Sequence, residues 1–139
     1  NGTQEIFWSD PRVLVFSVHR HGQGFYPGTG SPTEVGHGQG KGFNVNVALP
    51  EGYGDCCLWA ALELVLMPMA RSFGPDLIIV SSGFDAVSGD PLGGCQCTVQ
   101  GFGLLAASVR RLALELCGGR LIMALEGGYE ADVLAQCFT

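Results

Sequence analysis

The chain has 139 residues, of which 47% are hydrophobic and 14% are charged, a composition that favours a folded domain over a disordered segment. Its formal net charge of −6 argues against a nucleic-acid-binding protein, which would carry a basic patch. No apolar run approaches the roughly 20 residues of a membrane span, and the first residues lack the pattern of a secretory signal. The sequence therefore predicts one domain, or part of one, that binds neither nucleic acid nor membrane directly.

The first half of the chain predicts two strands separated by a long loop. Residues 12–19 are rich in Val and predict a strand, and residues 43–49 alternate apolar and smaller or polar side chains with the period of a strand. The intervening residues 20–42 are rich in Gly. A loop of this length in a compact domain is usually functional or disordered. Its two aromatic residues, Phe25 and Tyr26, predict that it is partly packed.

The second half alternates helices and strands. Asp55 is the predicted N-cap of a helix that continues to about Phe73 and is bent or loosened at Pro68, which removes one backbone donor. The remaining predicted elements are a buried strand over 76–81, a loop over 82–97, a helix from Thr98 to Cys117, a strand over 120–125, a tight turn and a short helix from about Glu130. This alternation is typical of parallel strands joined by right-handed crossovers, and it predicts a parallel α/β fold.

Polar side chains follow the two strands of this second half. Asp85 follows the strand at 76–81, and Glu126-Gly127-Gly128-Tyr129 follows the strand at 120–125. Ligands of open parallel sheets bind outside the carboxyl ends of the strands. Asp85 fits a turn residue as well as a metal ligand, and Tyr129 fits a packed side chain as well as an oxyanion donor. The two glycines fit a tight turn or a close approach of backbone to a ligand.

Other polar residues favour structural roles. His19, His21 and His37 have no acid or further histidine at a helpful spacing, so we expect solvated or hydrogen-bonded histidines rather than a metal site. Asp90 precedes Pro91 and is predicted to form a turn. The cysteines show neither a zinc-finger spacing nor the context of a disulfide scaffold, and they are predicted to be free thiols: Cys56, Cys57, Cys95, Cys97, Cys117 and Cys137.

Five segments, in this order and spacing, resemble the histone deacetylase family of zinc amidohydrolases, most closely its class II branch: NGTQ at 1–4, SVHRHGQGFYPGTG at 17–30, GFNVNVAL at 42–49, SSGFDAVSGDPLGG at 81–94 and LEGGYE at 125–130. The resemblance covers nearly the whole chain. It implies a three-layer α/β/α fold of the arginase/deacetylase type with a mostly parallel sheet, and it implies that residues 1–139 are the C-terminal portion of one catalytic domain.

The resemblance also implies an activity and its setting. The activity is zinc-dependent hydrolysis of N-acetyl-lysine amides in histones or other proteins. Corepressor-type proteins are possible partners, and the nucleus, the cytoplasm or both are the expected compartments. Two alternatives stay open: a deacetylase of small acetylated amines such as polyamines on the same fold, and a non-catalytic interaction module that keeps the fold without the metal.

Particular residues match the functional positions of the family. The resemblance implies that Asp85 is one of three zinc ligands and that Tyr129 polarises the acetyl carbonyl. It implies a substrate tunnel lined by Tyr26, Leu92, Gly127 and Gly128. It also implies structural monovalent cations, potassium being the expected one, bound by backbone at two sites: Ser17 and Val18 at one, and Phe7, Asp10, Val13 and Phe43 at the other.

The resemblance further implies that important residues lie upstream of Asn1. The family's other two zinc ligands, an Asp and a His, and its proton-handling pair of histidines precede the position of NGTQ. One carboxylate does not hold a catalytic zinc ion, which normally takes three protein ligands. We therefore expect these 139 residues alone to be an incomplete catalytic domain, inactive and without tight zinc binding, with a large apolar surface left uncovered.

Overall fold

The computed structural model describes residues 1–137, which form two compact units. The first unit is Asn1–Glu51, and the second begins at Gly52. Each unit contains one pair of parallel strands, so the predicted parallel pairing is confirmed in both. The two units are described separately below.

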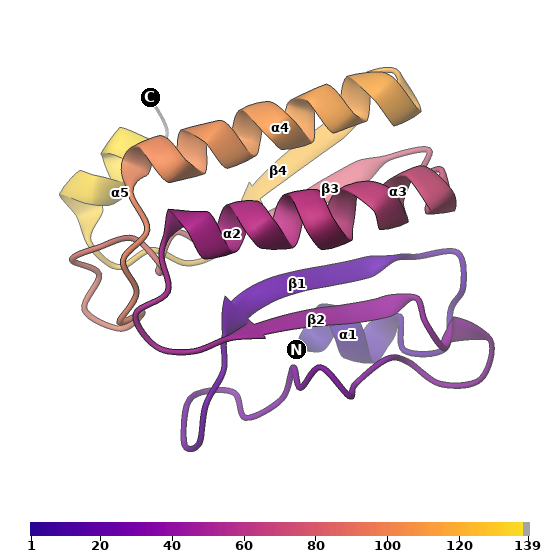
Figure 1. The fold of residues 1–139 in the computed structure, drawn as a ribbon, viewed down its shortest axis with the longest axis horizontal. Coiled ribbons are helices and arrows are strands. Elements are labelled where there is room, and N and C mark those ends of the chain that lie inside the picture. The colour runs from indigo at the N-terminus through magenta and orange to yellow at the C-terminus, as the bar shows by residue number, and fades with distance from the viewer. Residues whose placement is uncertain (138–139) are drawn as a thin grey trace. The chain divides into compact units, whose positions relative to one another are not determined.

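The first unit is built on strands β1 (Val15–Arg20) and β2 (Asn44–Leu49), which run side by side in Figure 1. Their parallel register runs from Val15 opposite Asn44 to Arg20 opposite Leu49. The Gly-rich connection contains only the 3₁₀ turn η1 (Gly38–Gly40). The helix α1 (Gly2–Ile6) was not predicted, because five residues are too few to show a helical apolar period.

A partly buried polar network joins Gln4 and Glu34 to the two asparagines of β2. The Asn44 side-chain amide donates to Gln4 Oε1 at 2.8 Å and to the Glu34 carbonyl at 2.6 Å, and Asn46 donates to the same two atoms at 2.8 and 3.1 Å. The two asparagines lie two residues apart and therefore share one face of β2. The Glu34 carboxylate accepts from the Gly30 backbone N–H, and this bond lowers the pKa of Glu34. The network satisfies the side-chain NH₂ group of the buried Asn44, which would be costly to bury alone, whereas Asn44 Oδ1 has no hydrogen-bond partner among the described residues.

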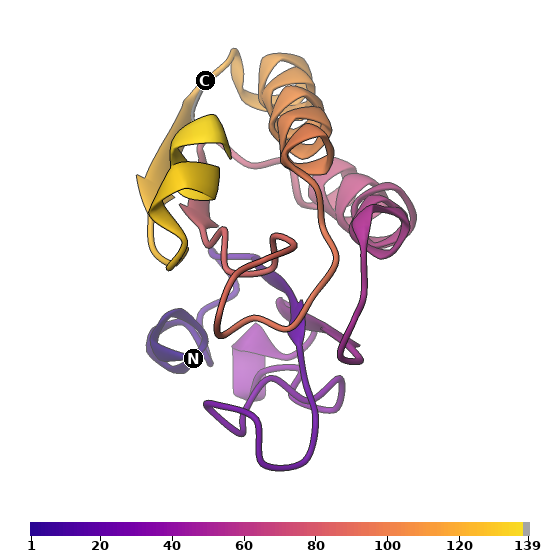
Figure 2. The same cartoon turned by 90° about the vertical axis from the view of Figure 1, so that its left-hand side faces the viewer.

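The second unit is built on strands β3 (Ile78–Ser82) and β4 (Leu121–Leu125), joined by the long helix α4 (Val99–Cys117). Figure 2 shows α4 and the preceding helical stretch next to one another on one side of this strand pair. The two helical stretches form a core with four buried residues: Leu62, Met67, Ala70 and Leu112. Five partly buried residues pack against this core: Leu66, Ile78, Leu105, Val109 and Leu116. The short helix α5 (Ala131–Cys137) follows β4, as predicted.

The helix predicted over 55–73 changes its hydrogen-bonding pattern in the middle. It consists of α2 (Asp55–Ala61), a π-helical turn η2 (Leu62–Leu66) and α3 (Met67–Phe73). Pro68 lies in the first turn of α3 but inside a continuous helical stretch, so its missing N–H removes one donor from the hydrogen-bond ladder. The π turn directly before it absorbs the mismatch, since a π bulge accommodates one altered hydrogen bond within an otherwise continuous helix.

The predicted N-cap role of Asp55 is wrong. The N-cap residue is Gly54, and Asp55 is the first residue of α2. Its carboxylate accepts from Thr98 instead, at 2.8 Å from the backbone N–H and at 2.7 Å from the hydroxyl. The Thr98 hydroxyl accepts in turn from the Gly101 N–H at 2.9 Å, which confirms Thr98 as the cap of α4. Asp55 therefore links the starts of two helices.

Strand β3 is less buried than its apolar sequence predicts. Ile79 is 63% exposed, and β4 exposes Ile122, Met123 and Leu125 to about the same degree. Exposure in β3 alternates from residue to residue, as expected of a strand with one side against the helical core. In β4 the adjacent residues Ile122 and Met123, which face opposite sides, are both about half exposed, so both sides of β4 are partly open. The second unit thus presents large apolar side chains on its strands.

The helical stretch Asp55–Phe73 is also long and apolar enough, by length and composition, to cross a membrane. Its 19 residues include a window of mean hydropathy 1.4, although the apolar run itself is interrupted by Glu63 and Arg71. A core helix of a soluble protein passes the same test, and the buried residues of this stretch pack against Leu112 of α4. Composition alone is therefore weak evidence for a membrane segment.

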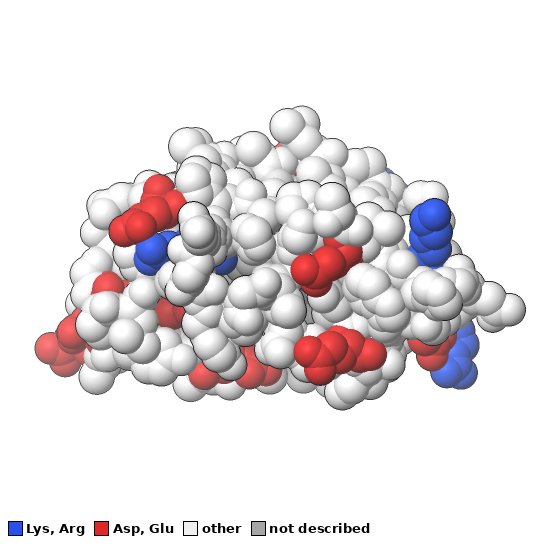
Figure 3. All heavy atoms as spheres, turned by 90° about the horizontal axis from the view of Figure 1, so that it is seen from below, with Lys and Arg blue, Asp and Glu red and all other residues white. Residues whose placement is uncertain are grey.

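The charged side chains gather into no basic surface on the face shown in Figure 3, where the blue side chains are separated. Within residues 1–137, four ion pairs join basic side chains to acids: Arg12 with Asp10, Arg20 with Glu51, Arg71 with Glu115, and Arg111 with Glu63. Both observations agree with the acidic balance of the sequence.

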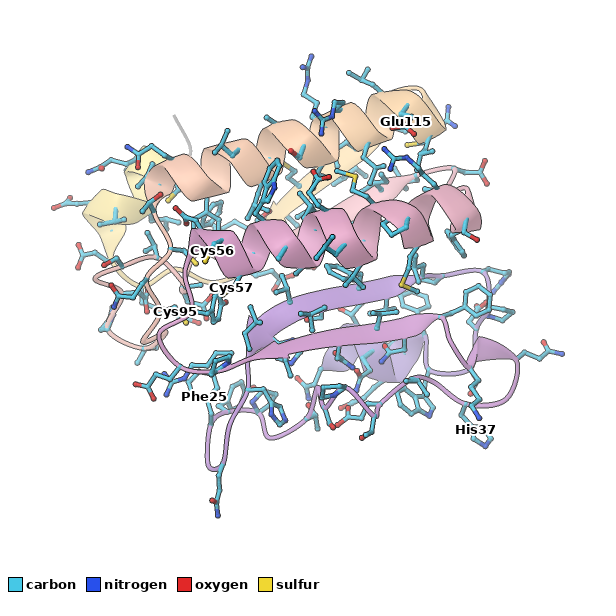
Figure 4. The ribbon with its side chains drawn as sticks, viewed as in Figure 1. Phe25, His37, Cys56, Cys57, Cys95 and Glu115 are labelled. Carbon is cyan, nitrogen blue, oxygen red and sulfur yellow. The ribbon has the colours of Figure 1, made fainter. Side chains whose placement is uncertain are left out.

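All six cysteines are free, as predicted, but their surroundings differ. Figure 4 places Cys56 and Cys57 at the start of α2, where Cys56 is exposed. Cys97 is fully buried, and burial raises the pKa of its thiol to about 12. Because the thiolate is the reactive form, burial and the raised pKa together predict a slow reaction of Cys97 at neutral pH.

Alkylation is expected to distinguish these thiols. With iodoacetamide at pH 7.5 on the folded protein, Cys56 should react at least about tenfold faster than Cys97, because exposure and thiolate fraction both set the rate. Mass spectrometry of the peptides after timed quenching measures the two rates, and unfolding in urea should remove the difference. Equal rates in the folded protein would contradict the burial of Cys97.

Candidate functional site

The carboxyl ends of β3 and β4 lie together, and backbone bonds continue between the two segments beyond the strands. The Glu126 N–H donates to the Ser82 carbonyl at 3.0 Å, and the Phe84 N–H donates to the Gly127 carbonyl at 2.9 Å. The loops that carry the two predicted site motifs therefore start at the same edge of this strand pair, where open parallel sheets bind ligands.

Asp85 and Tyr129 face a common point at this edge. A Cβ atom placed on Gly127 would lie 3.5 Å from Asp85 Oδ1 and 3.7 Å from the Tyr129 hydroxyl oxygen. Asp85 is half-buried, and Tyr129 is 58% exposed. The structure therefore brings together the two side chains that the sequence placed at strand ends, and the absent side chain of Gly127 leaves the space between them open.

Two other glycines allow the backbone to pack closely around these side chains. A Cβ atom on Gly93 would lie only 1.6 Å from the Asp85 carbonyl oxygen, so no other residue fits there without moving the backbone. Gly128 has a φ of 130°, and a Cβ atom there would lie 2.9 Å from Leu134 and 3.2 Å from Phe84. Gly128 is thus required both by its conformation and by its neighbours.

Asp90 connects the two loops. Its Oδ1 accepts from the backbone N–H groups of Leu92 at 2.8 Å and of Gly93 at 3.0 Å, which confirms the predicted turn. Its Oδ2 accepts from the backbone N–H of Tyr129 at 2.8 Å. This second role was missed, because no local pattern reports a bond across 39 residues. The carboxylate that shapes one loop also holds the other.

The loop that carries Asp85 is anchored along its length. Cys97 donates its N–H to the Ala86 carbonyl at 3.1 Å and accepts from the Ser88 N–H at 2.8 Å. Phe84 is buried and packs against Phe102 of α4, with ring centroids 5.1 Å apart. These contacts fix the loop on the scaffold of the unit, which a catalytic or binding side chain requires.

Within residues 1–137, no group of three or more His, Cys, Asp and Glu side chains is arranged to hold a metal ion. Asp85 is by its chemistry a suitable zinc ligand, but a catalytic zinc ion normally takes three protein ligands. The described residues therefore fit one ligand position and not a complete zinc site, and the inactivity expected of these residues alone stays a prediction.

The histidine prediction is confirmed for His19 in the first unit. Its Nδ1 lies 2.8 Å from the Ser17 hydroxyl, and its Nε2 lies 3.0 Å from the Gly30 carbonyl oxygen. The carbonyl can only accept, so Nε2 carries the proton and Nδ1 accepts from Ser17. Burial lowers the pKa of His19 and favours this neutral form.

The remaining predicted residues of the first unit lie on backbone turns and in the Gly-rich loop. The Phe7 carbonyl accepts from the Asp10 N–H, and the Asp10 carbonyl accepts from the Val13 N–H. The Phe43 carbonyl accepts from the Val15 N–H at 2.8 Å. Tyr26 is 82% exposed. The cation sites and the tunnel role of Tyr26 stay predictions.

Comparison with known proteins identifies the family. A family model described as "Histone deacetylase domain" matches residues 1–139. The chain is 48% identical to histone deacetylase 5 of Arabidopsis thaliana over 98% of its length, and 48% identical to histone deacetylase 7 of Homo sapiens over 99%. It is 46% identical over 98% to "Histone deacetylase 10, chloroplastic" of Oryza sativa subsp. japonica.

A solved structure also matches. The crystal structure of the HDA15 HD domain superposes with a TM-score of 0.91 at 44% identity, covering 99% of this chain and 38% of that one. This match confirms the predicted α/β fold of the arginase/deacetylase type. The chain spans 21%, 30% and 14% of the length of the Arabidopsis, rice and human relatives, respectively. By family model, sequence and fold, this chain belongs to the histone deacetylase family.

Proposed function

We propose that this chain forms part of a zinc-dependent lysine deacetylase domain of the class II type, which hydrolyses N-acetyl-lysine amides in histones or other proteins. The observation that carries the proposal is that Asp85 and Tyr129 face one open point above Gly127 at the ends of β3 and β4. A carboxylate and a phenol at one point suit an amide hydrolase, since one can bind a metal ion and the other can donate to an oxyanion. The names of the relatives support the same reaction.

Tyr129 is the proposed catalytic residue of this chain. Its hydroxyl would donate a hydrogen bond to the acetyl carbonyl oxygen as that oxygen gains negative charge. One such donor stabilises the transition state by roughly 3–4 kcal/mol. The half-exposed side chain leaves the hydroxyl accessible to a substrate, and the Tyr129 backbone N–H donates to the Asp90 carboxylate.

Asp85 is the proposed metal ligand of this chain. Two further protein ligands would have to join it, because the described residues supply no complete set. Zinc supplies a Lewis acid for the carbonyl and an activated water. Asp85 itself is held by the anchored loop and by the close contact of its carbonyl with Gly93.

Apolar and small residues are proposed to contact the acyl-lysine side chain. Leu92 is 60% exposed on the turn that Asp90 holds, and Tyr26 is 82% exposed in the first unit. Each methylene of lysine that such residues bury contributes about 0.8 kcal/mol. Gly127 and Gly128 would shape part of the tunnel wall in the second unit. Acetylated lysine side chains are the proposed substrates, and the nucleus or cytoplasm is the proposed location.

Structural potassium ions are a further part of the proposal. Ser17 and Val18 would contribute to one site through β1. Carbonyls at the turns before β1 and at the start of β2 would form the other: Phe7, Asp10, Val13 and Phe43. The hydroxyl of Ser17 donates to His19 and therefore keeps its lone pairs available for a cation.

Substitution of Asp85 tests the proposal. In a complete catalytic domain that carries this chain, Asp85→Asn is expected to lose most of its zinc, and turnover on an acetyl-lysine peptide should fall in the same proportion, because an amide is a much weaker ligand than a carboxylate. Elemental analysis of the purified protein and a peptide deacetylation assay measure the two quantities.

The exposed Asp132 provides the matched control, since Asp132→Asn makes the same chemical change three residues after Tyr129 and should leave zinc and turnover unchanged. An Asp85→Asn domain with full zinc and full turnover would overturn the metal assignment. A zinc-loaded wild-type domain that hydrolyses acetylated polyamines but no acetyl-lysine peptide would overturn the proposed substrate.

A further inference from the structure

We propose that Asp90 is a positioning residue for Tyr129 and acts on deacetylation through it. The Asp90 carboxylate would fix the backbone from which the phenol projects, and it would fix the turn of Leu92 at the same time. This inference rests on the proposed function, because it assigns Asp90 a part in the same reaction.

The first support is the bonding of the carboxylate. Asp90 is 8% exposed, and its two oxygens accept from three backbone N–H groups at 2.8–3.0 Å. None of the ion pairs found within residues 1–137 includes it. A buried carboxylate is costly unless its charge is met by hydrogen bonds, so these N–H groups are what keep it in place.

The second support is the weak local anchoring of Tyr129. Its side chain is 58% exposed, and the two residues before it are glycines, of which Gly128 adopts a φ of 130°. Helix α5 begins only at Ala131. The direction of the phenol therefore depends on the backbone at Tyr129, and the bond from its N–H to Asp90 ties that backbone to a buried group.

The third support is that the turn uses only one of the two Asp90 carboxylate oxygens. Oδ1 alone closes the turn by accepting from Leu92 and Gly93. Oδ2 reaches the other loop and accepts from Tyr129. One buried group thus anchors both the proposed contact with the lysine side chain and the proposed donor to its acetyl oxygen. A displacement of about 1 Å at such a position can cost 10²-fold in rate.

Asp90→Asn tests this role with the smallest possible change. Asparagine keeps one oxygen, which can retain both turn bonds, and its NH₂ group then faces the Tyr129 N–H and cannot accept from it. In the complete zinc-loaded domain, kcat should fall by about 10- to 100-fold, while zinc content and KM stay near the wild-type values.

A double-mutant cycle shows whether the loss passes through Tyr129. If it does, Asp90→Asn should lower the residual turnover of the Tyr129→Phe enzyme by less than about twofold. Asp55→Asn is the matched structural control, since Asp55 also holds backbone and hydroxyl groups in this unit without contacting Tyr129. It should lower Tm, and any change in turnover should be the same in both backgrounds. Equal losses from Asp90→Asn in the two backgrounds would overturn the proposal.

Hydrogen exchange provides a readout that depends neither on activity nor on a variant. In the wild-type protein the Tyr129 amide should exchange at least about tenfold more slowly than an unprotected amide, because it is bonded to a buried carboxylate. Exchange at the unprotected rate would overturn the positioning role even if the domain is an active deacetylase. A slow Tyr129 amide in a zinc-loaded domain without any deacetylase activity would instead support the Asp90 contact and overturn the proposed function.

Discussion

Tyr129→Phe is expected to lower turnover on an acetyl-lysine peptide by about 10²–10³-fold in a complete zinc-loaded domain. Phenylalanine keeps the ring and the exposed position of Tyr129 and removes only the hydroxyl that faces the point above Gly127. Since the lost hydrogen bond strengthens as the acetyl oxygen gains negative charge on the way to the tetrahedral intermediate, kcat should fall more than KM changes. Steady-state kinetics on the peptide measure both.

Metal content distinguishes this variant from Asp85→Asn. The phenol is not a proposed ligand, so Tyr129→Phe should retain wild-type zinc, whereas Asp85→Asn should lose zinc and turnover together. Thermal stability should change little in Tyr129→Phe, because the hydroxyl lies on a half-exposed side chain. Unchanged turnover with unchanged zinc would remove Tyr129 from the mechanism and leave it a packing residue.

Local sequence patterns predicted most of the secondary structure, because the elements begin and end at residues with strong local preferences. Thr98 caps α4 through its own hydroxyl, and Gly118 ends α4 in the left-handed conformation. The alternation around Asn44 and Asn46 predicted β2. The π turn before Pro68 was not predicted, because it depends on how an entire helix adjusts to one missing donor.

The candidate site shows the same division between local and distant information. Asp85 and Tyr129 were predicted because strand ends gather at one edge of a parallel sheet. The roles of Asp55 and Asp90 were not, since each carboxylate bonds to a backbone group about 40 residues away. Asp55 was predicted to be a helix cap and Asp90 a turn residue because aspartate is common at both kinds of position. Bonds to residues about 40 positions away leave no pattern in a single sequence.

Gly93→Ala is expected to disrupt the site without touching a reacting group. The added methyl would lie 1.6 Å from the Asp85 carbonyl oxygen, far inside contact distance, so the backbone at Asp85 or Gly93 must move. Gly93 is not among the described glycines with positive φ, so the cost comes from this contact rather than from strain in the substituted residue. We expect a destabilisation of about 1–3 kcal/mol, together with loss of zinc and turnover as Asp85 shifts.

Gly103→Ala supplies the matched control. Gly103 lies inside α4, and outside its chain neighbours and the adjacent backbone of its own helix no described atom lies within 4 Å of a Cβ placed there. Because alanine is a better helix former than glycine, this variant should be more stable by about 0.5–1 kcal/mol and keep full activity. Urea denaturation of both variants in the complete domain, with zinc analysis of each, measures the contrast. A Gly93→Ala domain as stable and as active as Gly103→Ala would show that the close approach to the Asp85 carbonyl does not hold the metal ligand in place.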